Sequence, residues 1–177
     1  FIKKHELNNC AVFVAGDFGI GFESQRDEIR RMKHLNERLI HSNSIVYGVR
    51  GNHDNPMYFT GKFDMSNIKL VPDYSILELN NQRILCVGGT LSIDRTNRKS
   101  YFKSNKLILD NGDLNINNYW RDENFVYDYN KAYESKNIDI VVTHSAPYFA
   151  YPYVKDNLYS WAASDPSIID EVDQERK

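Results

Sequence analysis

Three short apolar runs in this chain each lead directly into residues with chemically reactive side chains. The runs at 11–15, 44–49 and 139–142 precede Asp17, Asn52-His53-Asp54 and His144 respectively. Continuous apolar runs of this length are typical of strands buried on both faces. In open α/β sheets, ligands bind outside the carboxyl ends of the strands, so side chains that follow neighbouring strands converge. The pattern therefore predicts an α/β fold with one site at a sheet edge.

The turn Gly51-Asn52-His53-Asp54 is the most specific of these signals. Ordinary residue usage gives it a chance occurrence on the order of one in a thousand in a chain of this length. The Asn52 oxygen is a hard metal ligand, and the adjacent imidazole can bind metal or move protons. Asp54 can hold the second nitrogen of that imidazole and fix its tautomer. The alternative is a polar turn with a solvated histidine, and the two other polar strand ends argue against it.

The remaining elements are expected from periodicity and turn residues. Apolar residues at helical spacing predict a helix over 23–42, and strand, helix, strand is almost always a right-handed parallel unit. Further strands are expected at 68–71, 75–79 and 83–87, and further helices at 125–136 and from 164–166 onward. Residues 90–123 have no clean period and are expected to form a loop. Candidate substrate contacts within that loop are Asp94, Arg95, Tyr101, Trp120 and Arg121, and a solvated insertion is the alternative.

Composition bounds the class of protein. The chain has 177 residues and a formal net charge of −2, which suits a single domain over 1–177 and does not favour a nucleic-acid-binding surface. A nuclease remains compatible with this charge. No apolar run reaches the length of a membrane span. Cys10 and Cys86 lie in or beside strand-like runs and are expected to be reduced core residues, so we expect a cytoplasmic protein.

The strand-end side chains form a mixed oxygen and nitrogen ligand set. A carboxylate, an amide oxygen and an imidazole suit Mn, Fe or Zn better than an all-oxygen cage for Mg or Ca, although Mg remains possible. Asp17 can bridge two ions because a carboxylate has two oxygens. Two ions roughly 3.5–4 Å apart can clamp a phosphate and activate water. His53 would then be free to protonate the leaving oxygen.

Gly16-Asp17, Gly51-Asn52-His53-Asp54 and Thr143-His144 together resemble the middle motifs of the calcineurin-like metallophosphoesterase family. The stretch from Gly88 to Arg95 also resembles bacterial and phage members, and the resemblance spans residues 11–147. It implies a four-layer α/β/β/α sandwich with a two-metal centre that hydrolyses phosphate esters. It further implies that Asp17 bridges both ions, that Asn52 and His144 bind the second ion, and that His53 is the general acid, oriented by Asp54.

The chain departs from the family pattern at its ends. The family opens with an Asp-x-His motif and closes with a Gly-His-x-His motif, and neither is present. Both ends read as cut inside helices, so the fold is expected to be truncated. As written, the chain offers three of the usual ligands, too few to hold two ions tightly, and could be inactive for that reason. A protein phosphatase is less favoured, because Asp54 stands where those enzymes carry Glu.

Three functions remain open at this point. The leading hypothesis is a metal-dependent hydrolase of a small phosphomonoester or a phosphodiester. The alternative is a non-catalytic scaffold or binding protein that keeps the fold and uses the tyrosine-rich loop at 148–161 as its binding face. A nucleotide-binding domain is disfavoured, since the chain has no Gly-x-Gly-x-x-Gly or Walker loop.

Overall fold

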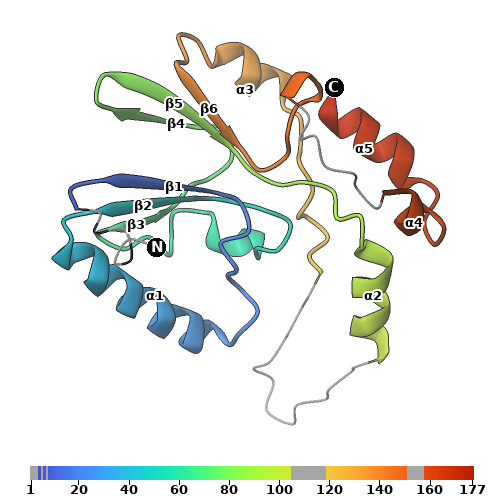
Figure 1. Ribbon diagram of the computed structural model, residues 1–177, viewed down its shortest axis with the longest axis horizontal. Coiled ribbons are helices and arrows are strands. Elements are labelled where there is room, and N and C mark those ends of the chain that lie inside the picture. The colour runs from blue at the N-terminus through green and yellow to red at the C-terminus, as the bar shows by residue number, and fades with distance from the viewer. Residues whose placement is uncertain (1–3, 5, 7, 105–118, 151–157) are drawn as a thin grey trace.

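The computed structural model describes residues 4, 6, 8–104, 119–150 and 158–177 (Figure 1). Its strands form two three-stranded sheets. The first sheet is parallel, in the order β1 (Ala11–Ala15), β2 (Ile45–Val49) and β3 (Ile68–Leu70). In the second sheet, β4 (Ser75–Leu79) pairs antiparallel with β5 (Gln82–Val87), which pairs parallel with β6 (Ile140–Thr143). The expected α/β class is confirmed.

The two sheets pack face to face through one apolar cluster. Tyr47 and Val49 of β2 meet Ile84 and Cys86 of β5 in this cluster. Phe13 of β1 stacks on Tyr47 with the ring centroids 5.1 Å apart. Because β1, β2 and β6 all contribute to this packed region, their carboxyl ends are brought to one side of the molecule.

Helix α1 (Gln25–His41) covers the outer face of the first sheet (Figure 1). Met32 and Leu39 from the helix pack with Val46, Ile68 and Leu70 from the sheet. The helix begins where Ser24 accepts a hydrogen bond from the Asp27 N–H, which satisfies one of the free donors of the first turn. The order helix, sheet, sheet is consistent with the expected α/β sandwich. The outer face of the second sheet is more open, since Val141 of β6 is 57% exposed.

The hairpin that joins β4 to β5 has a two-residue turn. Asn80 and Asn81 have φ angles of 51° and 61°. Two successive positive φ angles are typical of a type I′ turn, whose twist matches that of the flanking strands. Asparagine tolerates this left-handed conformation better than most residues, which explains why the expected hairpin forms at this position.

A helix lies inside the stretch for which the sequence predicts a loop. α2 spans Arg95–Ser104, and the expectation of an irregular segment over 90–123 is wrong for this part. The sequence shows no apolar stripe here because charged contacts, rather than apolar packing, fasten α2: its Arg95 pairs with Asp165 and Glu171, and its Arg98 pairs with Glu123. The other helices are α3 (Tyr129–Glu134), α4 (Leu158–Ala162) and α5 (Ile168–Arg176).

Both cysteines are free thiols. Cys86 is buried in the core between the sheets, and burial raises the pKa of its thiol to about 11. Cys10 is only partly buried, beside the hydroxyl of Ser44. Among the helices of the described residues, none combines the length and apolar character that crossing a membrane requires.

Candidate functional site

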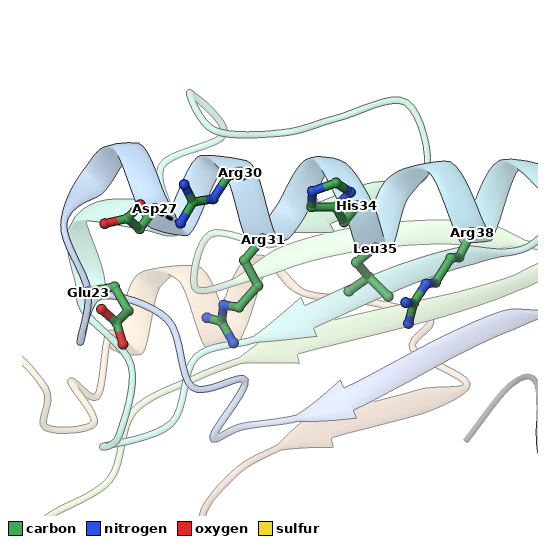
Figure 2. A pocket seen from close by; sticks show the side chains of 7 residues that line it. All are labelled: Glu23, Asp27, Arg30, Arg31, His34, Leu35 and Arg38. Carbon is green, nitrogen blue, oxygen red and sulfur yellow. Dashed lines mark ion pairs between the residues drawn. The ribbon is translucent and has the colours of Figure 1, made fainter.

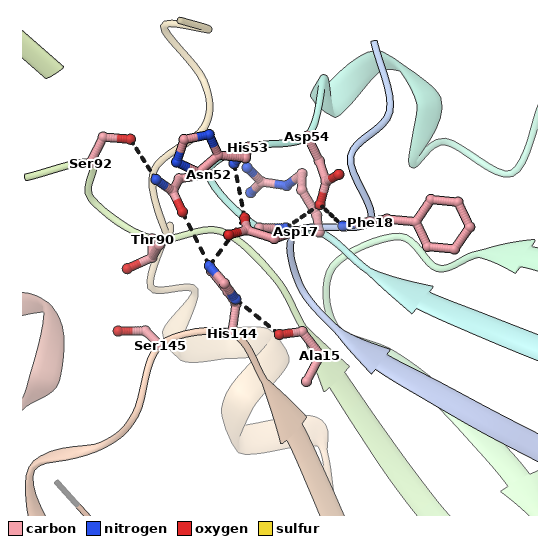
Figure 3. A network of polar contacts seen from close by, with 12 residues as sticks. Ala15, Asp17, Phe18, Asn52, His53, Asp54, Thr90, Ser92, His144 and Ser145 are labelled. Atoms are coloured by element: carbon pink, nitrogen blue, oxygen red, sulfur yellow. Dashed lines mark hydrogen bonds and ion pairs between the residues drawn. The ribbon is translucent and has the colours of Figure 1, made fainter. Parts of the chain in front are cut away.

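Side chains from three strand ends meet at the carboxyl edge of the sheets (Figure 3). Asp17 follows β1, Asn52 follows β2 and His144 follows β6. The His144 Nε2 atom lies 3.1 Å from Asn52 Oδ1 and 3.4 Å from Asp17 Oδ1. The structure therefore brings together the three residues that the sequence proposed as metal ligands, although they are separated by up to 127 positions along the chain (144 − 17).

The hydrogen bonds around this cluster indicate which atoms carry protons. His144 Nδ1 lies 2.9 Å from the Ala15 carbonyl oxygen, which can only accept, so we assign the imidazole proton to Nδ1. In the neutral ring, Nε2 then presents a lone pair. The Asn52 Nδ2 amide donates to Ser92 Oγ at 2.8 Å, which leaves Oδ1 facing the cluster. Three lone-pair atoms from Asp17, Asn52 and His144 thus face one another.

This donor set fits one divalent ion. Ligand distances of about 2.0–2.2 Å place neighbouring ligand atoms on one ion roughly 3 Å apart. The observed separations of 3.1 and 3.4 Å agree with this spacing. The imidazole also has the backbone partner on its other nitrogen that metal-bound histidines usually have. Across the described ranges, no group of three or more His, Cys, Asp or Glu side chains gathers at one point, so this set relies on the Asn52 amide.

Asp54 is fully buried and binds backbone rather than imidazole. Its carboxylate accepts from the N–H groups of Phe18, Gly19, Ile20 and Gly51 at 2.6–3.2 Å. Within the described part of the chain, no hydrogen bond joins Asp54 to the His53 ring. The expectation that Asp54 orients the His53 imidazole directly is therefore replaced by a different role: it ties the glycine loop after β1 to the turn after β2, since its four acceptor contacts occupy both oxygens.

Two glycines allow the strand ends to approach this closely. A Cβ atom on Gly16, which has a φ of +92°, would lie 2.0 Å from His144 Nδ1. A Cβ on Gly51 would lie 2.3 Å from the backbone nitrogen of Asp17. Asp17 itself has a φ of 52°, an uncommon conformation for a non-glycine residue, and such strained backbone is often found at functional sites.

His53 lies at the same edge, with its ring beside Asn52 (Figure 3). Its backbone N–H donates to Asp17 Oδ1 at 3.1 Å, so the main chain at His53 helps to fix the Asp17 carboxylate. No described residue forms a hydrogen bond with the His53 imidazole.

Three buried polar residues behind Asn52 were not singled out from the sequence. Ser92 accepts from Asn52, Arg98 Nη2 donates to the Asn52 carbonyl oxygen at 3.2 Å, and the same Arg98 atom pairs with Glu123 at 3.1 Å. Burial raises the pKa of Glu123, an effect that hydrogen bonds from Ser92 and Arg98 partly offset. No local sequence pattern indicates a role for these residues at the site, because Arg98 and Glu123 lie in a charged stretch without periodicity.

Two of the candidate substrate residues, Arg95 and Asp94, form contacts within the protein. The Arg95 guanidinium forms ion pairs with Asp165 at 2.6 Å and with Glu171 at 2.5 Å, and these pairs hold the pKa of both carboxyls below their usual range. This geometry supports a structural role for Arg95, fastening α2 to the segment around α5, in place of the expected substrate contact. The Asp94 carboxylate lies 3.9 Å from Arg98.

A separate groove of about 690 Å³ runs along α1 (Figure 2). Its lining is Glu23, Asp27, Arg30, Arg31, His34, Leu35 and Arg38. Arg30 pairs with Asp27 at 2.8 Å and Arg31 pairs with Glu28 at 2.6 Å, so much of the positive charge is neutralised locally. None of the residues predicted for the site line this groove.

Comparison with known proteins identifies a family. The model for calcineurin-like phosphoesterases matches residues 2–169. No curated protein and no solved structure matches the chain. The family match covers nearly the whole chain, and it confirms the resemblance that the strand-end motifs carry.

Proposed function

Because the chain belongs to the family of calcineurin-like phosphoesterases, we propose that it is a metal-dependent hydrolase of phosphate esters. The observation that carries this proposal is the convergence of three lone-pair atoms on one point, from Asp17, Asn52 and His144. When the His144 ring is neutral with its proton on Nδ1, these three atoms present lone pairs to one another, and a cation between them would stabilise the arrangement. Their separation and chemistry suit Mn, Fe or Zn, and Mg remains a candidate.

In this proposal, each ligand has a defined support from the fold. His144 is oriented by the Ala15 carbonyl, and Asp17 is held by the backbone N–H of His53. The second oxygen of Asp17 is available for a further ion, so a two-metal centre remains the form that we propose. A divalent ion bound here supplies the Lewis acidity that polarises a phosphoryl group.

We further propose that His53 protonates the leaving oxygen. Its ring has no hydrogen-bond partner among the described residues, and it lies beside the proposed ligand Asn52 (Figure 3). General acid catalysis of this kind typically contributes ~10²–10⁴ in rate. The substrate that we propose is a small phosphomonoester or a phosphodiester.

One observation favours the second candidate, a binding protein without catalysis. Tyr148 is 70% exposed, Phe149 90% and Tyr159 77%, and all three follow His144 in the chain. Exposed aromatic side chains are common anchors in protein interfaces. Residues 151–157 of this predicted loop lie outside the described residues. The presence of His53 beside the proposed ligands argues for the hydrolase instead, because a scaffold has no use for a general acid.

The test measures metal binding and hydrolysis together. We expect Mn²⁺ to raise the melting temperature of the wild-type protein and to support hydrolysis of p-nitrophenyl phosphate or of its bis-ester. His144→Ala should lose both effects, while Arg30→Ala, which alters an exposed ion pair on α1, should keep both. Mn²⁺ binding without hydrolysis of either ester would favour the scaffold. Absence of binding would overturn the metal site itself.

A further inference from the structure

A buried polar network lies directly behind Asn52. Ser92 is 1% exposed, Arg98 7% and Glu123 0%. Burying a charged pair is costly unless each group is well satisfied, so a network in this position is informative. These residues lie on the side of the Asn52 amide that faces away from Asp17 and His144.

The hydrogen bonds in this network have a definite direction. The Glu123 carboxylate accepts from Arg98 Nη2 at 3.1 Å, from the backbone N–H of Trp120 at 3.2 Å and from the Ser92 hydroxyl. Burial raises the pKa of Glu123, and the hydrogen bond from Ser92, the adjacent Arg98 guanidinium and the Trp120 N–H oppose this by favouring the ionised carboxylate. A carboxylate can only accept, so the single hydroxyl proton of Ser92 is directed to Glu123.

Ser92 is therefore left with lone pairs for its other neighbours. One faces Arg98 Nη1, and the other accepts from Asn52 Nδ2 at 2.8 Å. An Asn amide can be rotated by half a turn with little change of shape, which exchanges its oxygen and its nitrogen. Because the Ser92 proton is directed to Glu123, Ser92 needs a donor from Asn52, and only the orientation that points Nδ2 at Ser92 supplies one. That orientation turns Oδ1 toward His144, where it lies 3.1 Å from Nε2.

We propose that Glu123, acting through Ser92, fixes the orientation of the Asn52 amide and thereby sets the affinity of the site for its divalent ion. This inference rests on the proposed role of Asn52 as a metal ligand. Glu123 is a positioning residue: it touches neither the ligand atoms nor the substrate position. Arg98 assists by holding the Asn52 carbonyl oxygen and by balancing the charge of Glu123.

The experiment compares Mn²⁺ dissociation constants for Glu123→Gln, Ser92→Ala and the wild type. In Glu123→Gln, the new amide group can donate to Ser92, which frees the hydroxyl proton to turn toward Asn52 and favours the reversed amide. Loss of an outer-shell partner typically weakens metal binding ~10–100-fold, and we expect a loss in that range for both variants. Glu171→Gln is the matched control, since it removes a carboxylate from another ion pair that does not contact Asn52. Its Mn²⁺ affinity should stay within twofold of the wild type.

A double-mutant cycle distinguishes an effect on the orientation of the Asn52 amide from a general disturbance of the metal site. In Asn52→Asp, the side chain ends in a carboxylate, which has no wrong orientation because both of its terminal atoms are oxygens. Starting from Asn52→Asp, the additional Glu123→Gln change should therefore cost less than threefold in Mn²⁺ affinity. An equal loss in both backgrounds would overturn the orientation role, and so would unchanged affinity in Ser92→Ala. If Glu123→Gln fails to fold, the same cycle is measured with Ser92→Ala in its place, alone and combined with Asn52→Asp. Failure of the wild type to bind Mn²⁺ would instead overturn the proposed function.

Discussion

Asp54 and Glu28 divide six consecutive backbone N–H groups between them. Asp54 accepts those of residues 18–20, and Glu28 accepts those of residues 21–23. Both carboxylates are fully buried. Hydrogen bonds to ionised acceptors are among the strongest in proteins, so these main-chain contacts hold the loop after Asp17 in addition to the core packing of Ile20.

Replacing Asp54 tests this relationship. Asp54→Asn exchanges an acceptor oxygen for an NH₂ group that faces backbone donors, which leaves buried N–H groups without partners. We expect the free energy of unfolding to fall by about 2–4 kcal/mol, measured by urea denaturation. If Asp54 acted only through the His53 ring, the variant would keep wild-type stability and lose turnover alone. That combination would contradict the backbone role.

A methyl group at Gly16 should disturb His144. In Gly16→Ala, the new Cβ would lie 2.0 Å from the ring nitrogen, so the imidazole must move away from Ala15. We expect at least a tenfold loss in Mn²⁺ affinity, measured by titration. Gly61→Ala is the matched control: Gly61 also has a positive φ, of +79°, but a Cβ there meets nothing within 4 Å. It should lose about 1–2 kcal/mol of stability and keep its Mn²⁺ affinity. Equal Mn²⁺ affinity in both variants would refute the proposed contact.

Replacing His53 should affect chemistry and not metal binding. For His53→Gln, kcat should fall by ~10²–10⁴ on an alkyl phosphate, and the Mn²⁺ dissociation constant should change less than twofold. The loss should be smaller on p-nitrophenyl phosphate, because a good leaving group needs less help from a proton donor. A loss of the same size on both substrates would argue against the general-acid role.

The ion pairs of Arg95 predict an acid-sensitive contact between α2 and the segment around α5. Asp165 and Glu171 have lowered pKa values in the folded protein, caused mainly by hydrogen bonds from Arg95. Their contribution to stability is present above the unfolded pKa values of about 4 and is lost as the pH falls through the folded values. The Glu171 side chain is 40% exposed, so solvent weakens its ion pair with Arg95. Arg95→Ala should therefore lower the free energy of unfolding at pH 7 by about 1–2 kcal/mol and make its decrease below about pH 4 less steep.

Denaturation curves at several pH values check this prediction. Arg30→Ala provides the comparison, because its pair with Asp27 is largely exposed and should contribute at most about 1 kcal/mol. A pH dependence in Arg95→Ala identical to that of the wild type would show that the two carboxyls are not stabilised by Arg95.

The sequence predicts where the strands lie because each strand is a self-contained apolar run. It also predicts that Asp17, Asn52 and His144 meet, but the route differs from the expected one: β6 belongs to the second sheet, so His144 reaches Asp17 and Asn52 through the packing of the two sheets and not as a neighbouring strand of β1 and β2. It could not predict α2, Glu123 or the true contacts of Asp54. Those depend on polar and charged contacts between distant segments, such as Arg98 with Glu123, and such contacts leave no local periodicity. The ion pairs of Arg95 could not be predicted from the sequence for the same reason, because its partners lie 70 and 76 residues away.

The main-chain anchoring of residues 18–23 has a consequence for how this protein can change. Asp54 and Glu28 bind N–H groups that every residue except proline has, so these hydrogen bonds do not depend on the side chains of the loop. Three positions are constrained for other reasons, since Gly19 and Gly21 have positive φ angles and Ile20 is fully buried in the core. Phe22, which packs edge-on against Trp120 with centroids 5.2 Å apart, binds Glu28 through its backbone N–H, so that hydrogen bond does not require the aromatic ring. Mutational drift and laboratory evolution are therefore expected to change position 22 more freely than Gly19, Ile20 or Gly21, while the backbone hydrogen bonds beside Asp17 are retained.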